Sequence, residues 1–179
     1  MVRGGRRRSR GSPRLQPGQA LAEFALVAVP LLLLLLGIVQ FTYLYNAQVG
    51  LTNAVRDVAR YGSALVANTN GTASASATLT RAFLQTSLSK YVAPFSSGQV
   101  GPGTQVCYAP YVDAAGASAV RVTVTAEYDH PLIVPIIGGI IDGLDGAMDG
   151  AFRITVSSDL RVDNPLQPIP NLSSAACVS

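Results

Sequence analysis

Few side chains in this sequence could carry out chemistry, and they lie far apart along the chain. There is one histidine, His130, and there are two cysteines, Cys107 and Cys177. Neither cysteine is near His130, and the set is too small for a multi-His or multi-Cys metal site. His130 precedes Pro131, which favours a solvated turn. No P-loop, G-x-S-x-G or H-E-x-x-H motif occurs. We therefore expect no enzyme, no metal and no cofactor.

Three aspartates, Asp142, Asp145 and Asp149, alternate with glycines in one short segment. Carboxylates at short intervals are the ligands that Ca²⁺ prefers, but this spacing is not that of an EF-hand loop. Aspartate–glycine pairs are also common in turns. We favour solvated turns over a calcium site.

The most pronounced feature of the sequence is an uncharged, apolar stretch from Phe24 to Tyr45 that contains six consecutive leucines. As a helix it would be about 33 Å long, enough for a hydrocarbon core of ~30 Å. A buried helix of a soluble domain is the alternative, but consecutive leucines leave no polar face for water. We expect a single membrane-spanning helix at about 24–45, in contact with the lipid bilayer.

Charge is distributed unevenly around this stretch. The first 18 residues hold six arginines and no acid, and without them 7 basic and 10 acidic residues remain, so the formal charge changes from +3 to −3. By the positive-inside rule, the N-terminus is cytoplasmic and the C-terminal part extracytoplasmic. A removable signal peptide is the alternative, but its apolar run is usually shorter. A basic arm for nucleic acid is a further alternative, but arginines beside a span usually contact anionic lipid.

This topology places Cys107 and Cys177 in an oxidising compartment, and they are the only two thiols. We expect them to form a disulfide that closes a loop of about 70 residues. The alternative is two unpaired thiols.

One carboxylate, Glu23, stands at the start of the apolar stretch, directly before Phe24. A carboxylate at the edge of a membrane helix is costly unless it stays at the headgroups or finds a cationic partner. Glu23 is therefore either a hydrated interfacial residue or a group that pairs with a partner.

Glu23 also belongs to a longer pattern: a glycine ends the basic leader, an acid and an aromatic open the apolar stretch, and a polar segment with two arginines follows it. This pattern resembles the N-terminal region of the TadE-like family, pilus-assembly proteins associated with tight-adherence (Flp) pili. The family often has an acidic residue where Gln40 stands. The matching segments are Gly18-Gln19-Ala20, Glu23-Phe24-Ala25-Leu26, Gly37-Ile38, Thr52-Asn53-Ala54, Arg56 and Ala59-Arg60-Tyr61.

The resemblance implies a prepilin-type leader that a membrane peptidase cuts between Gly18 and Gln19. Glu23 would become the fifth residue of the processed chain, and with Phe24 it would serve recognition or docking at the helix start. The partners implied are this prepilin-type peptidase and other pilus-assembly or pilin-like (pseudopilin) subunits, which would pack on the N-terminal helix.

A polar surface on the outer part of the helix is the second site that the resemblance implies. Asn53, Arg56 and Arg60 would form this assembly face. The alternative is that these residues are a solvated helix surface.

The remaining sequence predicts a small α+β head. Apolar residues recur at helical spacing beyond the membrane span and again in a second segment, and two segments alternate between apolar and polar residues as strands do. The alternation indicates an antiparallel sheet with helices on one side, a pilin-like arrangement. The expected elements are helices to about residue 65 and over 79–92, a loop over 67–77, and strands over 105–111, 120–128 and 152–162.

The connection 129–151 is apolar from Pro131 to Ile141, but that run is too short to cross a membrane. It could pack on the head, lie at the membrane surface or contact a partner, and we favour packing on the head.

The sequence thus divides into four parts: a basic cytoplasmic leader, a TadE-like segment, an extracytoplasmic head and a proline-rich tail. Their bounds are 1–18, 19–62, 63–163 and 164–179. We expect a non-enzymatic, minor pilin-like protein of the cytoplasmic (inner) membrane that takes part in assembly of an adhesive, Flp-type pilus. The alternative is a membrane-tethered binding module unrelated to a filament.

Overall fold

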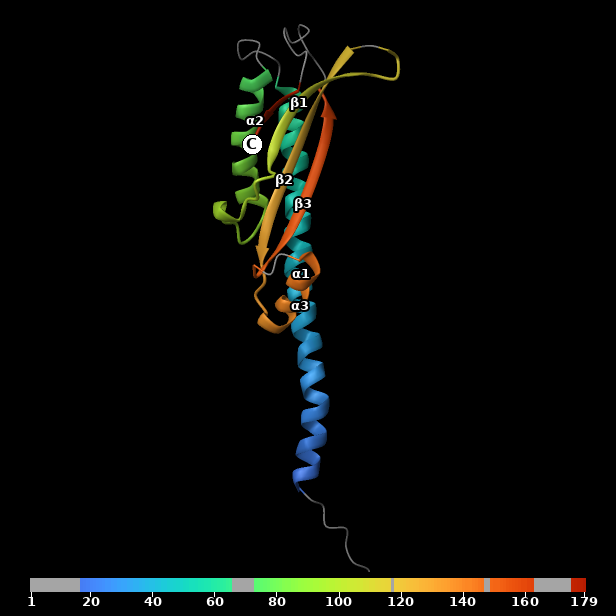
Figure 1. The fold of residues 1–179 in the computed structure, drawn as a ribbon, viewed down its shortest axis with the longest axis vertical. Helices are drawn as coiled ribbons and strands as arrows, with labels where there is room; N and C mark the ends of the chain where they lie inside the picture. Colours follow the sequence, from blue (N-terminus) through green and yellow to red (C-terminus); the bar gives the residue numbers. More distant parts are fainter. Residues whose placement is uncertain (1–16, 66–72, 117, 147–148, 163–174) are drawn as a thin grey trace, which may run out of the picture.

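The computed structural model describes residues 17–65, 73–116, 118–146, 149–162 and 175–179. Most of the basic leader, the 66–72 part of the predicted loop and most of the proline-rich tail lie outside these residues. The longest element is helix α1 (Pro17–Ala64). Its N-terminal half projects from a head that is built around its C-terminal half (Figure 1). Pro17 opens the helix at a position where its fixed φ and missing N–H are tolerated.

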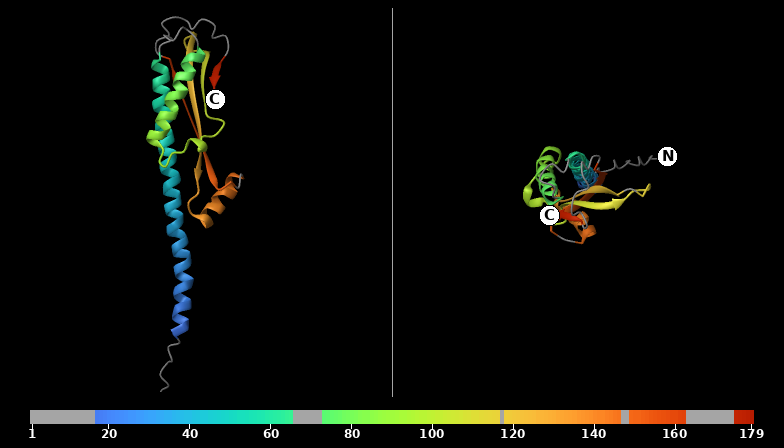
Figure 2. Two further views of the ribbon diagram at one scale, coloured as in Figure 1. Left: turned by 90° about the vertical axis from the view of Figure 1, so that its left-hand side faces the viewer. Right: turned by 90° about the horizontal axis from the view of Figure 1, so that it is seen from above.

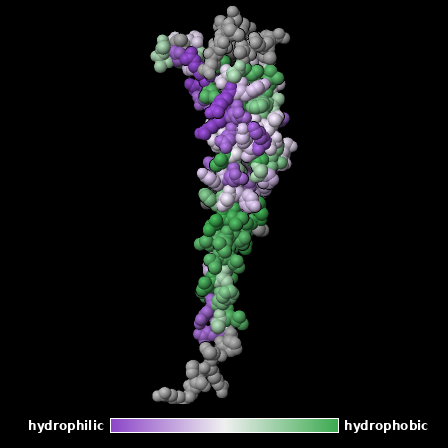
Figure 3. Space-filling view, turned by 180° about the vertical axis from the view of Figure 1, so that it is seen from behind, coloured by the Kyte–Doolittle hydropathy of each residue, from purple (hydrophilic) through white to green (hydrophobic). Residues whose placement is uncertain are grey.

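The projecting half of α1 is apolar and has almost no protein around it. In its most apolar 18-residue window only 6% of the residues are buried, and α1 is the one described helix long and apolar enough to cross a membrane. Figure 3 shows this half as an apolar band between a hydrophilic N-terminal end and a more polar head. A water-exposed helix of this composition would be unfavourable, so the surface fits a bilayer or other apolar helices.

The C-terminal half of α1 forms part of the core of the head. Ala47, Leu51, Val55 and Val58 recur every three or four residues and are buried, as their spacing predicts. Helix α2 (Ala73–Tyr91) packs against this face. The two helices are in close contact at Gly50, where a Cβ would clash with the carbonyl oxygen of Tyr91.

The head contains one antiparallel sheet with the strand order β3-β2-β1-β4. Alternate residues of β2, from Val120 to Tyr128, are buried beneath the helices. Figure 2 shows α1 and α2 on one side of the sheet, so the predicted α+β architecture is confirmed. The strands are β1 (Gln105–Val112), β2 (Ser118–Pro131), β3 (Ala151–Arg161) and β4 (Ala176–Val178).

A tyrosine hydroxyl joins the sheet to both helices at the centre of the head. Tyr108 on β1 donates a hydrogen bond to the carbonyl oxygen of Gly62 on α1 at 2.9 Å, and its hydroxyl lies 3.0 Å from that of Thr80 on α2. Burial raises the pKa of Tyr108, so the hydroxyl stays neutral and able to donate. The sheet is thereby fixed to both helices by polar contacts as well as by apolar packing.

The structure differs from the sequence prediction at both ends of the head. Helix α2 begins at Ala73, inside the predicted loop, because alternating alanine and serine are compatible with a helix. Strand β4 was not predicted, because three residues are too few to show alternation. It pairs with β1 in a register that places Cys177 opposite Cys107, and the two sulfur atoms are bonded.

The prediction for His130 was wrong. It is not in a solvated turn, because β2 continues to Pro131 and carries His130 onto the buried face with a relative exposure of 0%. Its ring meets the ring of Tyr128 edge-on, and its Nδ1 lies 2.9 Å from the carbonyl oxygen of Pro131. Its Nε2 is buried with no hydrogen-bond partner.

Candidate functional site on the long helix

The predicted docking residues lie on the first two turns of α1 and point away from any other element. Gly18, Gln19, Glu23 and Phe24 are all exposed. The Nε2 of Gln19 donates to the Oε1 of Glu23 at 3.0 Å, one helical turn away. A Cβ at Gly18 would meet no atom within 4 Å. A carboxylate is thus presented near the positive end of the helix, with a second oxygen open to a donor from another molecule.

The predicted assembly face lies on α1 just beyond the apolar stretch. Its members are spaced by three or four residues, so they form one exposed stripe on the side opposite the buried core residues. A shallow hollow of about 270 Å³ is part of this surface. The predicted members are Asn53, Arg56 and Arg60, and the exposed Tyr45 and Val49 extend the stripe toward the apolar stretch. The hollow is lined by Tyr45, Gln48, Val49, Thr52, Asn53 and Arg56.

The two arginines of this stripe differ from those on the sheet in their partners. Within the described parts of the chain, neither Arg56 nor Arg60 forms an ion pair, whereas the arginines on the sheet pair with aspartates. Thr52 uses its hydroxyl to donate to the carbonyl oxygen of Gln48. The stripe therefore offers two arginines without an ion-pair partner among the described residues, and the ring of Tyr45 lines the same hollow as Arg56. This combination can accept an acidic or aromatic partner surface.

The connection 129–151 forms a short helix, α3 (Pro135–Asp145), where β2 ends beside α1. It packs on α1 and β3, as the sequence interpretation favoured, but only with part of its surface. On α1, the Oε1 of Gln40 accepts hydrogen bonds from the backbone N–H groups of Ile133 and Val134, both at 3.0 Å. The Gln40 side chain is completely buried by this contact.

The expectation of solvated aspartate turns is wrong for Asp142. Its side chain is buried, and its two carboxylate oxygens accept from the backbone N–H groups of Asp149 at 3.2 Å and Gly150 at 3.1 Å. The carboxylate thereby stabilises the turn that connects α3 to β3. In the described residues no group of three or more His, Cys, Asp or Glu side chains could hold a metal ion.

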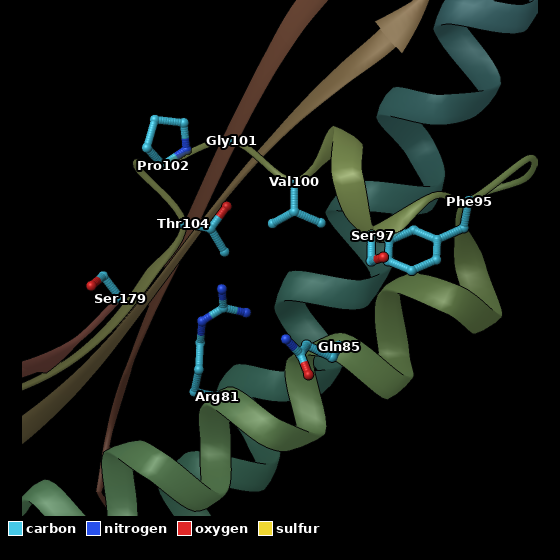
Figure 4. Close-up of a pocket in the computed structure, with 9 residues that line it drawn as sticks. All are labelled: Arg81, Gln85, Phe95, Ser97, Val100, Gly101, Pro102, Thr104 and Ser179. Carbon is cyan, nitrogen blue, oxygen red and sulfur yellow. The ribbon is translucent and has the colours of Figure 1, made fainter.

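Sequence reasoning missed a hollow of about 490 Å³ between α2 and the segment that leads into β1 (Figure 4). Arg81 on α2 points into it, and the Nε and Nη1 atoms of Arg81 are buried without a hydrogen-bond partner. Burial lowers the pKa of the Arg81 guanidinium. No local sequence pattern predicts this hollow, because its walls come from segments that are distant along the chain, including Phe95, Thr104 and Ser179.

The comparisons with known proteins found a similarity that lies within α1. No curated protein and no solved structure matches the chain. The family model for TadE-like protein matches residues 18–60, a range that contains Gly18, Glu23, Asn53, Arg56 and Arg60 but none of the sheet. The N-terminal segment of this chain is therefore TadE-like, as its residue pattern predicts.

Proposed function

We propose that this chain is a non-enzymatic, minor pilin-like subunit that takes part in the assembly of tight-adherence (Flp-type) pili. The observation that supports this function best is the TadE-like match over residues 18–60. On the structure, that range covers the exposed apolar half of α1 and nearly all of the helix that enters the head. The family resemblance thus includes the exposed apolar half of α1 as well as the part of α1 that packs in the head.

Helix α1 continues without a break from the exposed apolar half into the head. The helix anchors the protein in the inner membrane and continues into the core of the head. A neighbouring apolar helix that packs on the exposed half would therefore position the whole head, because no flexible joint separates the two halves. The arginine stripe lies just above this apolar surface and would meet the head of the same neighbour.

Processing by a prepilin-type peptidase is part of the proposal. Cleavage between Gly18 and Gln19 would fall in the first turn of α1, so only that turn would have to unwind. It would remove the arginine-rich leader and create an α-amino group at Gln19, one turn from the Glu23 carboxylate. A charge-assisted hydrogen bond could then form between them, within one chain or between neighbours.

Intact-mass measurement of protein from the native host tests the processing step. We expect 179 − 18 = 161 residues for the wild type. The Gly18→Leu variant should remain full length, and it is a suitable control because a side chain at Gly18 has open space around it. A full-length wild-type chain in a host with an active prepilin peptidase would contradict processing.

Pilus formation tests the assembly role. A strain that lacks the gene should form few or no pili, and wild-type protein should restore them. Glu23→Gln and Arg56→Ala should restore fewer pili at normal membrane levels of protein, because each removes a charge that faces outward from α1. Arg121→Ala is the matched control, since Arg121 is exposed on the sheet. Normal piliation of the deletion strain would refute the role and favour a tethered binding module.

A further inference from the structure

The outward face of α3 is apolar although it has no protein cover. Ile133, two residues before the helix, and Ile136 and Ile140 within it have relative exposures of 55%, 65% and 64%. The charged side chain of Asp142 turns inward to backbone N–H groups just before β3, so it does not make this face polar. Each of these isoleucines leaves apolar surface in water, which is unfavourable in proportion to the exposed area. The face therefore fits an apolar medium.

The position of α3 along α1 indicates which medium this is. If the inner boundary of the hydrocarbon core lies at Glu23, then ~30 Å at ~1.5 Å per residue places the outer boundary about 20 residues later, near Tyr43. The hydrogen bonds to Gln40 fix the start of α3 on the membrane side of that boundary. Ile137 lies beside Gly37, one further turn into the bilayer.

Aromatic side chains on α1 mark the same level independently. Phe41, Tyr43 and Tyr45 are exposed, and such rings prefer the layer between headgroups and acyl chains. Figure 1 shows α3 at the lower end of the head, next to the projecting part of α1. The isoleucine face of α3 is thus continuous with the apolar surface of the membrane helix.

We infer that α3 is a second membrane element, an interfacial helix that inserts Ile133, Ile136 and Ile140 among the acyl chains of the outer leaflet. Its 11 residues are too few to cross the bilayer, but they suffice for a helix lying in the interface. The head is then held to the membrane at two points. This inference rests on α1 crossing the bilayer and does not depend on the role in pilus assembly.

The absence of tryptophan from the sequence allows a direct test. The full chain would carry one tryptophan at a time, as I140W or I136W, in phosphatidylcholine–phosphatidylglycerol vesicles with brominated acyl chains. We expect the brominated lipid to quench most of the emission of both variants. Val112 is 67% exposed at the far end of the sheet, so V112W should keep its emission. L34W reports whether α1 itself is inserted.

The outcomes distinguish lipid from protein as the surroundings of this face. Quenching of L34W but not of I140W and I136W would overturn the inference while leaving the span of α1 intact. A blue shift of the α3 variants without quenching would also overturn it, because it would indicate that a protein surface covers the face. Quenching that persists when the protein is diluted in lipid would support insertion, since contacts between copies weaken on dilution. None of these results depends on whether the protein forms pili.

Discussion

The side-chain oxygen of Gln40 accepts a hydrogen bond from the backbone N–H of Val134, 94 residues further along the chain, at 3.0 Å. Val134 precedes α3 and has no side chain that could cap it. N–H groups at a helix start need an acceptor. The long helix therefore supplies the acceptor that the sequence around α3 lacks, and this contact fixes the short helix at one level of α1.

Removal of this acceptor should loosen α3. In Gln40→Leu, the N–H groups of Ile133 and Val134 lose their partner, which costs roughly 1–3 kcal/mol for each buried group left unpaired. Hydrogen exchange followed by mass spectrometry should show faster exchange over 132–146 than in the wild type. Exchange in α2 should not change, because α2 does not depend on this contact.

Gln40→Glu is the matched control for this experiment. The Nε2 of Gln40 has no partner in the structure, so loss of the amide donor removes no hydrogen bond. A glutamate oxygen can still accept from both N–H groups, and exchange over 132–146 should stay close to that of the wild type. Unchanged exchange in Gln40→Leu would show that the hydrogen bonds do not hold α3.

The sequence predicted those parts of the fold that repeat with a clear period. Residues of β2 from Val120 to Tyr128 alternate strictly, and the core positions of α1 follow helical spacing, so both elements could be identified locally. The candidate residues on α1 were predicted in another way, from the resemblance of the N-terminal segment to the TadE-like family. Local periodicity thus sufficed for the elements but not for the candidate site.

Contacts between distant segments were not predictable in this way. Gln40 was visible only as a polar residue in an apolar stretch, and nothing in the sequence linked it to Val134. His130 was misplaced because a His–Pro pair favours a turn, whereas the length of β2 decides its burial. Strand β4 has three residues, and its place depends on pairing with β1. These features depend on tertiary register, which no single segment encodes.

The Cys107–Cys177 disulfide should contribute strongly to the stability of the head. Its two cysteines are separated by 70 residues, and for a loop of that size the chain-entropy model gives on the order of 4 kcal/mol. Cys177→Ser should lower the denaturant midpoint of the detergent-solubilised protein and increase proteolysis near β4. Reduced wild type should behave like the variant. If alkylation without reductant labels both cysteines in native protein, the bond does not form in the cell.

The buried His130 should make the head less stable at mildly acidic pH. Burial lowers the pKa of His130 below its ordinary value of 6.5, and the hydrogen bond to Pro131 opposes this only in part. Below pH 6.5 the unfolded chain therefore binds a proton at His130 more readily than the folded head does. Stability should be full above pH 6.5 and should fall as the pH drops from 6.5 through the lower pKa of the folded state.

Denaturant unfolding at several pH values between 5 and 8 measures this effect, and His130→Phe is the control. Phenylalanine keeps a ring beside Tyr128 but cannot take up a proton. His130 is the only histidine in the chain, so no other side chain has its ordinary pKa in the middle of this range. The variant should lose most of the decrease between pH 6.5 and 5. An equal decrease in the variant would assign the pH dependence to other groups.

Arg81 should cost the head stability, because the Nε and Nη1 atoms of its guanidinium are buried next to the hollow and no anion among the described residues forms an ion pair with it. Two of its nitrogen atoms lack hydrogen-bond partners, and such buried charged donors are unfavourable. Arg81→Met keeps the apolar stem and removes the charge, so we expect a gain of about 1 kcal/mol or more in the free energy of unfolding. Gln85→Met is the matched control, since Gln85 lines the same hollow but is exposed and uncharged. It should change stability by less than half as much.

A loss of stability in Arg81→Met alone would mean that the guanidinium has a stabilising partner in solution. Titration of the wild type with simple carboxylates would then show whether an anion fills the hollow.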